Sequence, residues 1–354
     1  MKKGIFGLVF ILMFASCQRI THSLPDPGST FVFTDSTGRN VTLPSQIMRI
    51  APSGSLAQMY LMAIAPDLFC AIAAPYQSGQ EEFLPPALAA LPVIGQFYGQ
   101  APFNPEEVAR ILPDVIIDIG ESKDSMASDM DDIFAMTGVP IIHITAELNH
   151  LHSKESTPEA FRTLGKLLNR EEKGEELALF CERVLVLAEN IMHQVGDNKK
   201  SVLYCMGNMG LNVLARNSFH SEILDWMTDN LAVVDNPSSR GIGNESNLEQ
   251  LFLWNPQVIL FAPGSIYASA NNLPVWREFR AIQSGNYYEV PQGPFNWMGS
   301  PPSINRYLGI LWMGAILYPE YAEYDLYEEV KEYYRLFYGF DLSREHFWSI
   351  VLGI

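Results

Sequence analysis

Residues 171–195 read EEKGEELALFCERVLVLAENIMHQV, and this stretch divides the chain into two parts. It carries no proline, and its apolar residues recur at the spacing of one helical face: Leu177, Phe180, Val184, Leu187 and Ile191. At about 1.5 Å per residue, a helix of this length extends for about 37 Å, which is enough to join two lobes rather than to cover one sheet. The sequence therefore predicts a single long helix with one structural unit on either side.

On the N-terminal side, short apolar runs alternate with helix-like stretches. Residues 31–41 (FVFTDSTGRNV) predict a hairpin, because Thr37-Gly38 supplies a turn between two β-rich arms. Strands are predicted at 47–51, 69–74, 115–119 and 139–144, and helices at about 55–66, 104–112 and 125–137. This alternation indicates a mostly parallel sheet with helices on both faces.

The same alternation resumes after Gly196. Strands are predicted at 201–206, 211–215, 231–234, 257–262 and 287–290, and long helices at about 302–318 and 323–338. We therefore expect an α/β fold with an N-terminal lobe over 31–170, the joining helix over 171–195 and a C-terminal lobe over 196–354.

One pattern occurs in both halves. The segment NPEEVARILPDVII, which begins at Asn104, resembles NLEQLFLWNPQVIL, which begins at Asn247. Each has Asn-x-Glu at a helix start, then a proline, then a buried strand. Each half therefore places one carboxylate, Glu106 or Glu249, on the first turn of a helix that leads into its sheet. We expect two lobes of related architecture.

The composition excludes several classes of function. With 23 basic and 40 acidic residues, the formal net charge is −17, and a surface so acidic repels nucleic acid.

The sequence contains no nucleophile elbow, P-loop or metalloprotease motif, so we expect no enzyme. Cys70, Cys181 and Cys205 lie in apolar runs without metal-ligand spacing, and we interpret them as small buried hydrophobes.

The first residues predict export. Two lysines precede the apolar stretch 5–15, which is too short to cross a bilayer, and small residues then lead to Cys17. Residues 1–17 resemble a bacterial lipoprotein signal peptide with the lipobox Phe14-Ala15-Ser16-Cys17. The resemblance implies that Cys17 becomes the acylated N-terminus, and residues 18–30 suit a flexible tether. An ordinary signal peptide with an incidental cysteine stays open.

The order of leader, hairpin, lobe, long helix and second lobe resembles the substrate-binding proteins of ABC importers for iron–siderophores, haem and vitamin B12. The segments that carry the resemblance are FVFTDSTGRNVTLP at 31–44, IMRIAPSGSLAQMY at 47–60 and the two Glu-x6-Pro segments. It implies two Rossmann-like lobes joined by one rigid helix, with the ligand in the cleft between them and little lobe motion on binding. It also implies that Glu106 and Glu249 form salt bridges with arginines of a permease dimer that works with ATPase subunits. We expect an extracytoplasmic monomer without a resident cofactor.

The candidate ligand contacts come from the loops at the carboxyl ends of the predicted strands, where open α/β lobes bind ligands. Rings and amides in these loops suit a bulky planar or chelated ligand, and they are Tyr76, Tyr98, Tyr267, Asn296 and Trp297. Arg240, in a Gly/Ser-rich loop, is a candidate partner for an anionic edge of the ligand. Arg306 is instead expected to form a structural ion pair.

The cargo itself is left open by the sequence. The resemblance favours an iron–siderophore, with cobalamin and haem next. His143, His150 and His152 keep a bare metal ion as an alternative. An oxyanion such as molybdate is a second alternative, and a surface-anchored hydrolase is an alternative of a different class.

Overall fold

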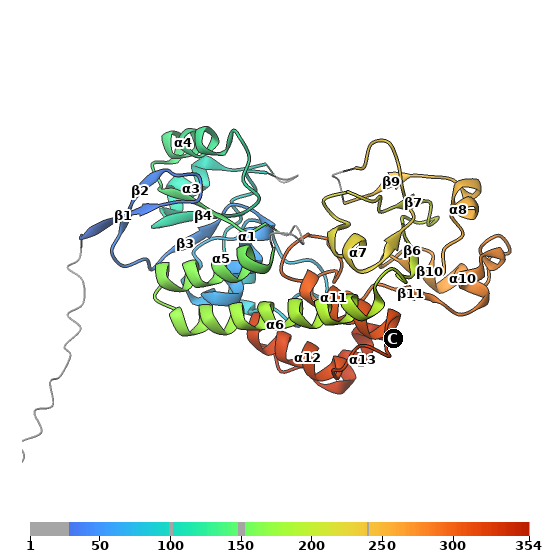
Figure 1. Ribbon diagram of the computed structural model, residues 1–354. Helices are drawn as coiled ribbons and strands as arrows, with labels where there is room; N and C mark the ends of the chain where they lie inside the picture. Colours follow the sequence, from blue (N-terminus) through green and yellow to red (C-terminus); the bar gives the residue numbers. More distant parts are fainter. Residues whose placement is uncertain (1–27, 99–101, 148–152, 239–240, 354) are drawn as a thin grey trace, which may run out of the picture.

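The computed structural model describes residues 28–98, 102–147, 153–238 and 241–353, and these form two α/β lobes with a long helix running beneath both (Figure 1). The two-lobed α/β architecture expected from the sequence is confirmed. Among the described residues, no helix is both long enough and apolar enough to cross a bilayer.

The N-terminal lobe is built on a short parallel sheet. Its strands are ordered β3–β4–β5, with bounds Ile50–Pro52, Val115–Gly120 and Ile141–Thr145. The predicted hairpin is present beside it, as β1 (Thr30–Thr34) paired antiparallel with β2 (Asn40–Pro44). The Asp35 carboxylate accepts hydrogen bonds from the backbone N–H groups of Thr37 and Arg39, both at 3.0 Å, and so fixes the turn.

Helices cover this sheet on both faces. They are α1 (Ser55–Ile64), η1 (Pro66–Leu68), α2 (Pro86–Ala89), α3 (Pro105–Ile111), α4 (Met126–Thr137) and α5 (Ser153–Leu167). The strand predicted at 69–74 is wrong, because this run makes only single bridges, from Phe69 to Ile50 and from Ile72 to Val93. The run is apolar because it is buried, and burial alone does not distinguish a strand from an irregular segment.

The C-terminal lobe has a mixed sheet centred on β6 (Ser201–Met206). Parallel partners are β8 (Asp229–Asn230) and β10 (Val258–Phe261), which pairs in turn with β11 (Tyr287–Glu289). Antiparallel pairing adds β7 (Asn212–Val213) and β9 (Asn244–Glu245). The prediction of a strand at 231–234 is wrong, because the strand in this region is β8, directly before those residues. In β8 the buried Asn230 side chain donates to Asp225 Oδ1 at 2.7 Å. A polar residue inside a strand does not appear in a hydrophobicity pattern.

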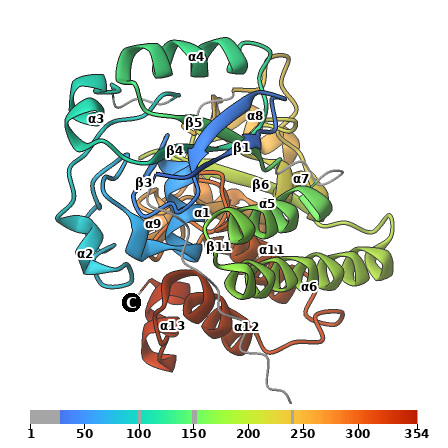
Figure 2. The ribbon, with the colours of Figure 1, turned by 90° about the vertical axis from the view of Figure 1, so that its left-hand side faces the viewer.

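The helices of this half are α7 (Glu222–Met227), α8 (Leu248–Trp254), α9 (Tyr267–Ala270), η2 (Trp276–Glu278), α10 (Arg280–Gln283), α11 (Arg306–Leu317), α12 (Leu326–Tyr333), the π-helical turn η3 (Tyr334–Tyr338) and α13 (Arg344–Leu352). In Figure 1 and Figure 2, α12 and α13 lie on the far side of α6 from the two sheets, and Figure 1 places them between the lobes.

The joining helix α6 spans Glu171–Val195, the same residues over which the sequence predicts it. It packs closely on α5, because a Cβ at Gly174 would lie 2.6 Å from the Phe161 carbonyl oxygen. Its other end packs on α11, where a Cβ at Gly314 would lie 2.9 Å from Ile191 Cδ1. Glycine at these two positions lets α6 touch both halves of the molecule.

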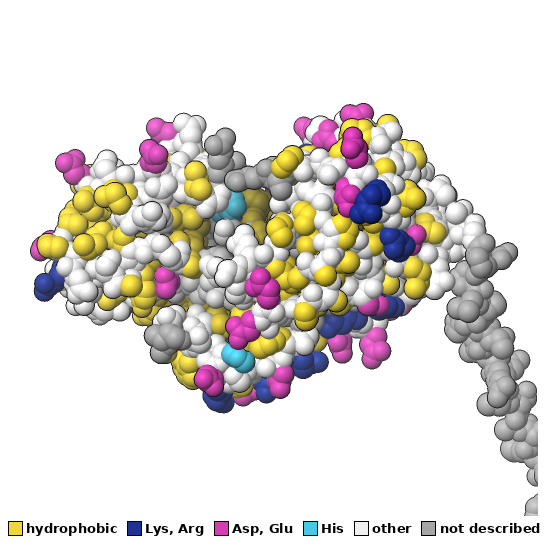
Figure 3. Space-filling model, turned by 180° about the vertical axis from the view of Figure 1, so that it is seen from behind, with side chains coloured by type: hydrophobic (Ala, Val, Ile, Leu, Met, Phe, Trp, Pro, Cys, Tyr) yellow, Lys and Arg dark blue, Asp and Glu magenta, His cyan; other side chains and the backbone are white. Residues whose placement is uncertain are grey.

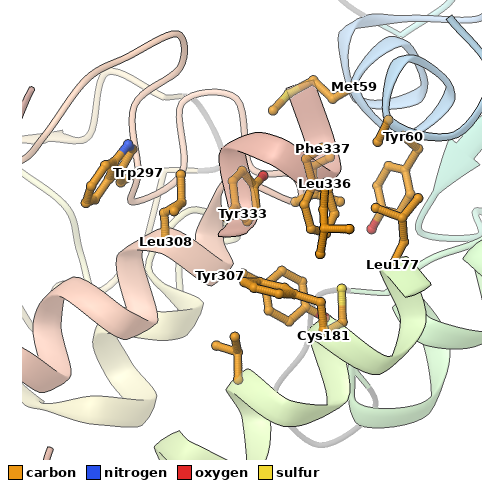
Figure 4. Packing of buried hydrophobic residues seen from close by; sticks show 14 of the residues in the cluster. Met59, Tyr60, Leu177, Cys181, Trp297, Tyr307, Leu308, Tyr333, Leu336 and Phe337 are labelled. Carbon is orange, nitrogen blue, oxygen red and sulfur yellow. The ribbon is translucent and has the colours of Figure 1, made fainter. Parts of the chain in front are cut away.

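One hydrophobic core extends through both lobes around α6 (Figure 4). Phe337 of η3 is 1% exposed and stacks on Tyr333 at 4.2 Å between ring centroids. It also meets the edge of Phe180 of α6 at 5.5 Å and of Phe161 of α5 at 5.8 Å. The three cysteines are buried and free, as predicted, and Cys181 lies within this core.

The end of the chain returns to the N-terminal lobe. Phe83 of that lobe meets Tyr334 at 5.7 Å and Phe340 at 5.1 Å between ring centroids. His346 of α13 lies 3.3 Å from Glu82. Residues 326–352 fall within the predicted C-terminal lobe of 196–354, and in the structure they contact both lobes. The lobes are thus joined twice, by α6 and by the C-terminal helices.

We predict that Phe337→Ala lowers the free energy of unfolding by about 3–5 kcal/mol, because it opens a cavity where three elements meet. Leu179→Ala is the matched control, since Leu179 lies on α6 but is 53% exposed, and it should change stability by less than about 0.5 kcal/mol. Urea unfolding of both variants tests this. Equal effects would show that the aromatic contacts do not hold the lobes together.

The expected ion pair of Arg306 is confirmed. Its guanidinium pairs with Glu222 of α7 and also donates to the Phe219 carbonyl oxygen. Burial raises the pKa of Glu222 from 4.5 to about 8, and Arg306 opposes this shift only in part. Burial also lowers the pKa of Arg306. In both pKa values, the effect of removing the charged group from water is therefore larger than the effect of the attraction between the two charges.

We predict that this carboxyl makes the fold less stable as pH rises from about 4.5 to about 8. In that range the folded state keeps a proton that the unfolded chain has released, so the free energy of unfolding falls with increasing pH. Glu222→Gln should remove this part of the pH dependence in urea unfolding at pH values across the range. Glu328→Gln, at a side chain that is 60% exposed, should leave it unchanged. An unaltered slope in Glu222→Gln would contradict the assignment.

Candidate functional site

Two adjoining cavities lie where the lobes face each other. Their volumes are about 770 and 900 Å³, and Ser55 and Pro301 line both of them. Figure 3 shows a hollow between the lobes that is bordered mainly by uncharged and hydrophobic side chains. The walls come from loops at the carboxyl ends of strands in both lobes, as the sequence predicts.

The smaller cavity is lined by carboxamides, and we call it the amide compartment. Its polar lining consists of Ser55, Gln58, Gln77, Gln80, Tyr204, Asn212, Gln292, Asn296 and Ser300. Its apolar lining includes Met59, Met206, Ile242 and Phe295. Among the lining residues that the structure describes, none carries a charge.

Some of these amides have structural partners. Gln58 Oε1 accepts from the backbone N–H of Ala73 at 2.7 Å, which fixes the N-terminal wall. Gln80 Nε2 donates to the Pro294 carbonyl oxygen at 3.1 Å and so joins one lobe to the other. Asn296 Nδ2 donates to the Tyr204 hydroxyl at 3.4 Å, and this leaves the Tyr204 proton available to another acceptor.

The larger cavity has an acidic wall, and we call it the acidic compartment. Its titratable lining residues are Tyr98, Asp118, Glu121, Lys123 and His220. Lys123 Nζ lies 3.7 Å from the centroid of the Tyr98 ring, whose hydroxyl donates to Asp129 at 2.6 Å. Burial, followed by the nearby charge of Glu147, raises the pKa of Glu121.

Beside the acidic compartment lies a buried hydrogen-bonded group formed by a residue of β4, a residue of β5 and the residue that follows β3. Ser53 donates to Asp118 Oδ1, and His143 Nδ1 lies 2.7 Å from Asp118 Oδ2. His143 is 0% exposed, and its Nε2 lies 3.2 Å from the Ser122 hydroxyl. The histidine therefore orients Asp118 rather than facing the cleft. His150 and His152 lie outside the described residues.

The sequence-predicted contact residues are divided by the structure. Asn296 lines the amide compartment and Tyr98 lines the acidic one. Trp297 is 0% exposed within the hydrophobic core, so it has no surface to offer a ligand. Its neighbour Asn296 takes the place at the cavity wall, in a turn that its side chain fixes by accepting from the backbone N–H groups of Met298 at 2.9 Å and Gly299 at 3.1 Å. Arg240 lies outside the described residues.

The two remaining tyrosines pack against protein. Tyr76 donates from its hydroxyl to the Pro85 carbonyl oxygen at 3.2 Å, and burial raises its pKa to about 12. Tyr267 packs beside Tyr287 at 5.7 Å between ring centroids. Neither lines either compartment. An aromatic ring in a loop anchors that loop as readily as it contacts a ligand, and the sequence alone does not separate the two roles.

Sequence reasoning missed the glutamines of the amide compartment. Gln77 and Gln80 follow Tyr76 in the loop that the strand-end rule selects, and Gln292 lies in the loop of Asn296. The signal in the sequence is that these two strand-end loops contain glutamines beside the predicted Tyr76 and Asn296.

Glu106 and Glu249 occupy equivalent positions. Each is exposed in the first turn of a seven-residue helix, α3 or α8, and neither forms an ion pair within the described parts of the chain. Asn104 caps α3 by accepting from Glu107 N at 3.0 Å, and Asn247 caps α8 by accepting from Gln250 N at 2.9 Å. Both helices lie on the side of the molecule away from α6, one on each lobe (Figure 1).

No group of three or more metal-ligating side chains occurs within the parts of the chain that the structure describes. His150 and His152, two of the three histidines behind the alternative of a bare metal ion, lie outside those parts.

Residues 81–294, more than half of the chain, match the family model described as periplasmic binding protein. The chain belongs to the periplasmic binding protein family. Proteins of this family bind solutes and are not enzymes, so the hydrolase alternative is set aside. This periplasmic binding protein is the extracytoplasmic solute-binding component of an ABC transporter.

Solved structures agree with this assignment. An ABC transporter solute binding protein from Sulfurospirillum deleyianum is 27% identical, with a TM-score of 0.79 over 90% of this chain and 98% of that chain. A periplasmic solute binding protein from Veillonella parvula is 23% identical, with a TM-score of 0.72 over 92% and 97% of the chains. The molybdate-bound protein MolA from Haemophilus influenzae is 18% identical, with a TM-score of 0.65 over 88% and 99%. The last two share the fold. A search of curated protein sequences finds no match.

We predict that Asp118→Ala lowers the free energy of unfolding by about 1–3 kcal/mol, because Ser53 and His143 lose their shared partner in a buried place. Asp132→Ala removes the same side chain at an exposed helix position and should have an effect below about 0.5 kcal/mol. Urea unfolding at neutral pH makes the comparison. Equal stability of the two variants would show that Asp118 does not organise the strand ends.

Proposed function

We propose that this periplasmic binding protein captures a metal chelate outside the cytoplasmic membrane and delivers it to the permease of an ABC importer. The observation that supports it best is the paired cavity between the lobes, at about 770 and 900 Å³. Cavities of this size suit a ligand much larger than a bare ion. An iron–siderophore, cobalamin and haem are all of this class.

The protein is held at the membrane by a lipid on Cys17 in this proposal. The lipobox-like segment Phe14-Ala15-Ser16-Cys17 and the polar stretch at 18–30 support it. Residues 1–27 lie outside the described part, so the anchor rests on the sequence. A monomer on such a tether reaches a membrane-embedded partner without needing a surface of its own for lipid.

Docking to the permease uses Glu106 and Glu249. Both carboxylates are exposed, and each stands at the same place on a capped helix of its own lobe. Because α6 and the shared core fix the lobes relative to each other, the separation of the two charges is also fixed. A symmetric pair of basic sites on a permease dimer can recognise such a spacing.

We predict that the double variant Glu106→Ala with Glu249→Ala binds ligand as the unaltered protein does but loses most uptake. Binding is measured on the purified protein with ferrichrome and cyanocobalamin. Uptake of the same two compounds, carrying radioactive metal, is measured in the cells that produce the protein. The matched control, Glu172→Ala with Glu320→Ala, removes two other exposed carboxylates and should keep uptake. Normal uptake by the first variant would refute the docking role.

A further inference from the structure

We propose that the amide compartment selects an uncharged metal complex whose periphery carries amide-type or hydroxamate oxygens, and that it discriminates against anionic chelates. This inference rests on the proposed function and narrows its ligand to one chemical class. It is based on the hydrogen-bond donors and acceptors of the cavity wall and on the charges around the cavity.

The first observation is that both lobes present unused amides to the cavity. Gln77, from the N-terminal lobe, and Gln292, from the C-terminal lobe, are exposed, and neither side chain hydrogen bonds to another described residue. A carboxamide donates through its NH₂ group and accepts through its carbonyl oxygen. Two such groups on opposite walls match a ligand whose own edge alternates carbonyl oxygens and N–H groups.

The second observation is the phenol on the wall. The Tyr204 side chain is 3% exposed, and its hydroxyl accepts from Asn296, so its proton can be donated into the cavity. Burial raises the pKa of Tyr204, which keeps this proton in place at neutral pH. A neutral donor of this kind suits a carbonyl or hydroxamate oxygen of an uncharged ligand.

The third observation concerns charge. An anionic chelate loses water when it enters a cavity, and this costs free energy unless basic groups meet it. Among the described residues that line the two compartments, Lys123 is the one lysine or arginine, and it shares its wall with Asp118 and Glu121. The net charge of −17 also repels anions as they approach. The described wall therefore disfavours a triply anionic ferric tris-catecholate and the two carboxylates of haem.

Two classes of metal complex combine an uncharged surface with amide-type or hydroxamate oxygens. A ferric trihydroxamate is neutral because three hydroxamate anions balance the iron charge. A cobalamin carries carboxamides around its ring. Both present oxygen acceptors and amide donors on an uncharged surface, and both offer apolar surface to Met59, Met206 and Phe295.

The test is calorimetric titration of the full-length protein with four probes: ferrichrome, cyanocobalamin, a ferric tris-catecholate and haemin. We expect one of the first two to bind at least about tenfold more tightly than either anionic probe. Gln77→Ala with Gln292→Ala should weaken that binding by about tenfold or more through the loss of two hydrogen-bonding groups. Tyr204→Phe should weaken it as well. Gln194→Ala, on the exposed face of α6, is the control and should leave it unchanged.

Preferential binding of an anionic probe would overturn the inference. If Arg240→Gln then abolished binding of that probe, the result would assign the anion contact to Arg240, as the sequence predicts. The receptor function would stand in that case. If no probe binds, the inference is also overturned. Uptake then decides the broader proposal: if cells that lack the protein still take up every iron chelate and cobalamin that the unaltered cells take up, the proposed function fails as well.

Discussion

The structure depends on one constraint, which is that the two lobes share a hydrophobic core instead of meeting at a hinge. Phe337 and Tyr333 from the end of the chain pack against Phe180 of the joining helix and, through Phe161, against the N-terminal lobe. Such contacts are close-packed and resist relative motion. The cleft walls, the lobe-to-lobe hydrogen bond of Gln80 and the spacing between Glu106 and Glu249 all follow from this arrangement.

The helices that carry Glu106 and Glu249, α3 and α8, are positioned by the same short sequence pattern in each half. Asn104 and Asn247 each cap a seven-residue helix, and each helix ends at a residue with positive φ before a proline and a buried strand. Interactions between residues close in the sequence therefore fix the positions of these two exposed glutamates. The cavity walls, by contrast, are assembled from loops far apart in the sequence.

This difference explains what the sequence could predict. The hairpin, α6, the paired capped helices and the strand-end position of the cleft were predictable, because turn residues, helical spacing and caps act over a few residues. Trp297 and Tyr76 were predicted to contact ligand, yet long-range packing turns Trp297 into the core and ties Tyr76 to Pro85. Asn230 inside β8 and the glutamines of the cavity were missed, because a polar residue gives no hydrophobic signal and the cavity is assembled from loops far apart in the sequence.

The hydrogen bond from Gln80 to the Pro294 carbonyl oxygen has a consequence for kinetics. Together with the shared core, it restrains the two walls of the cavity relative to each other. A receptor whose walls are restrained in this way spends little binding energy on ordering them. Association is then governed by diffusion into the opening, and different solutes are distinguished mainly by how long each one stays.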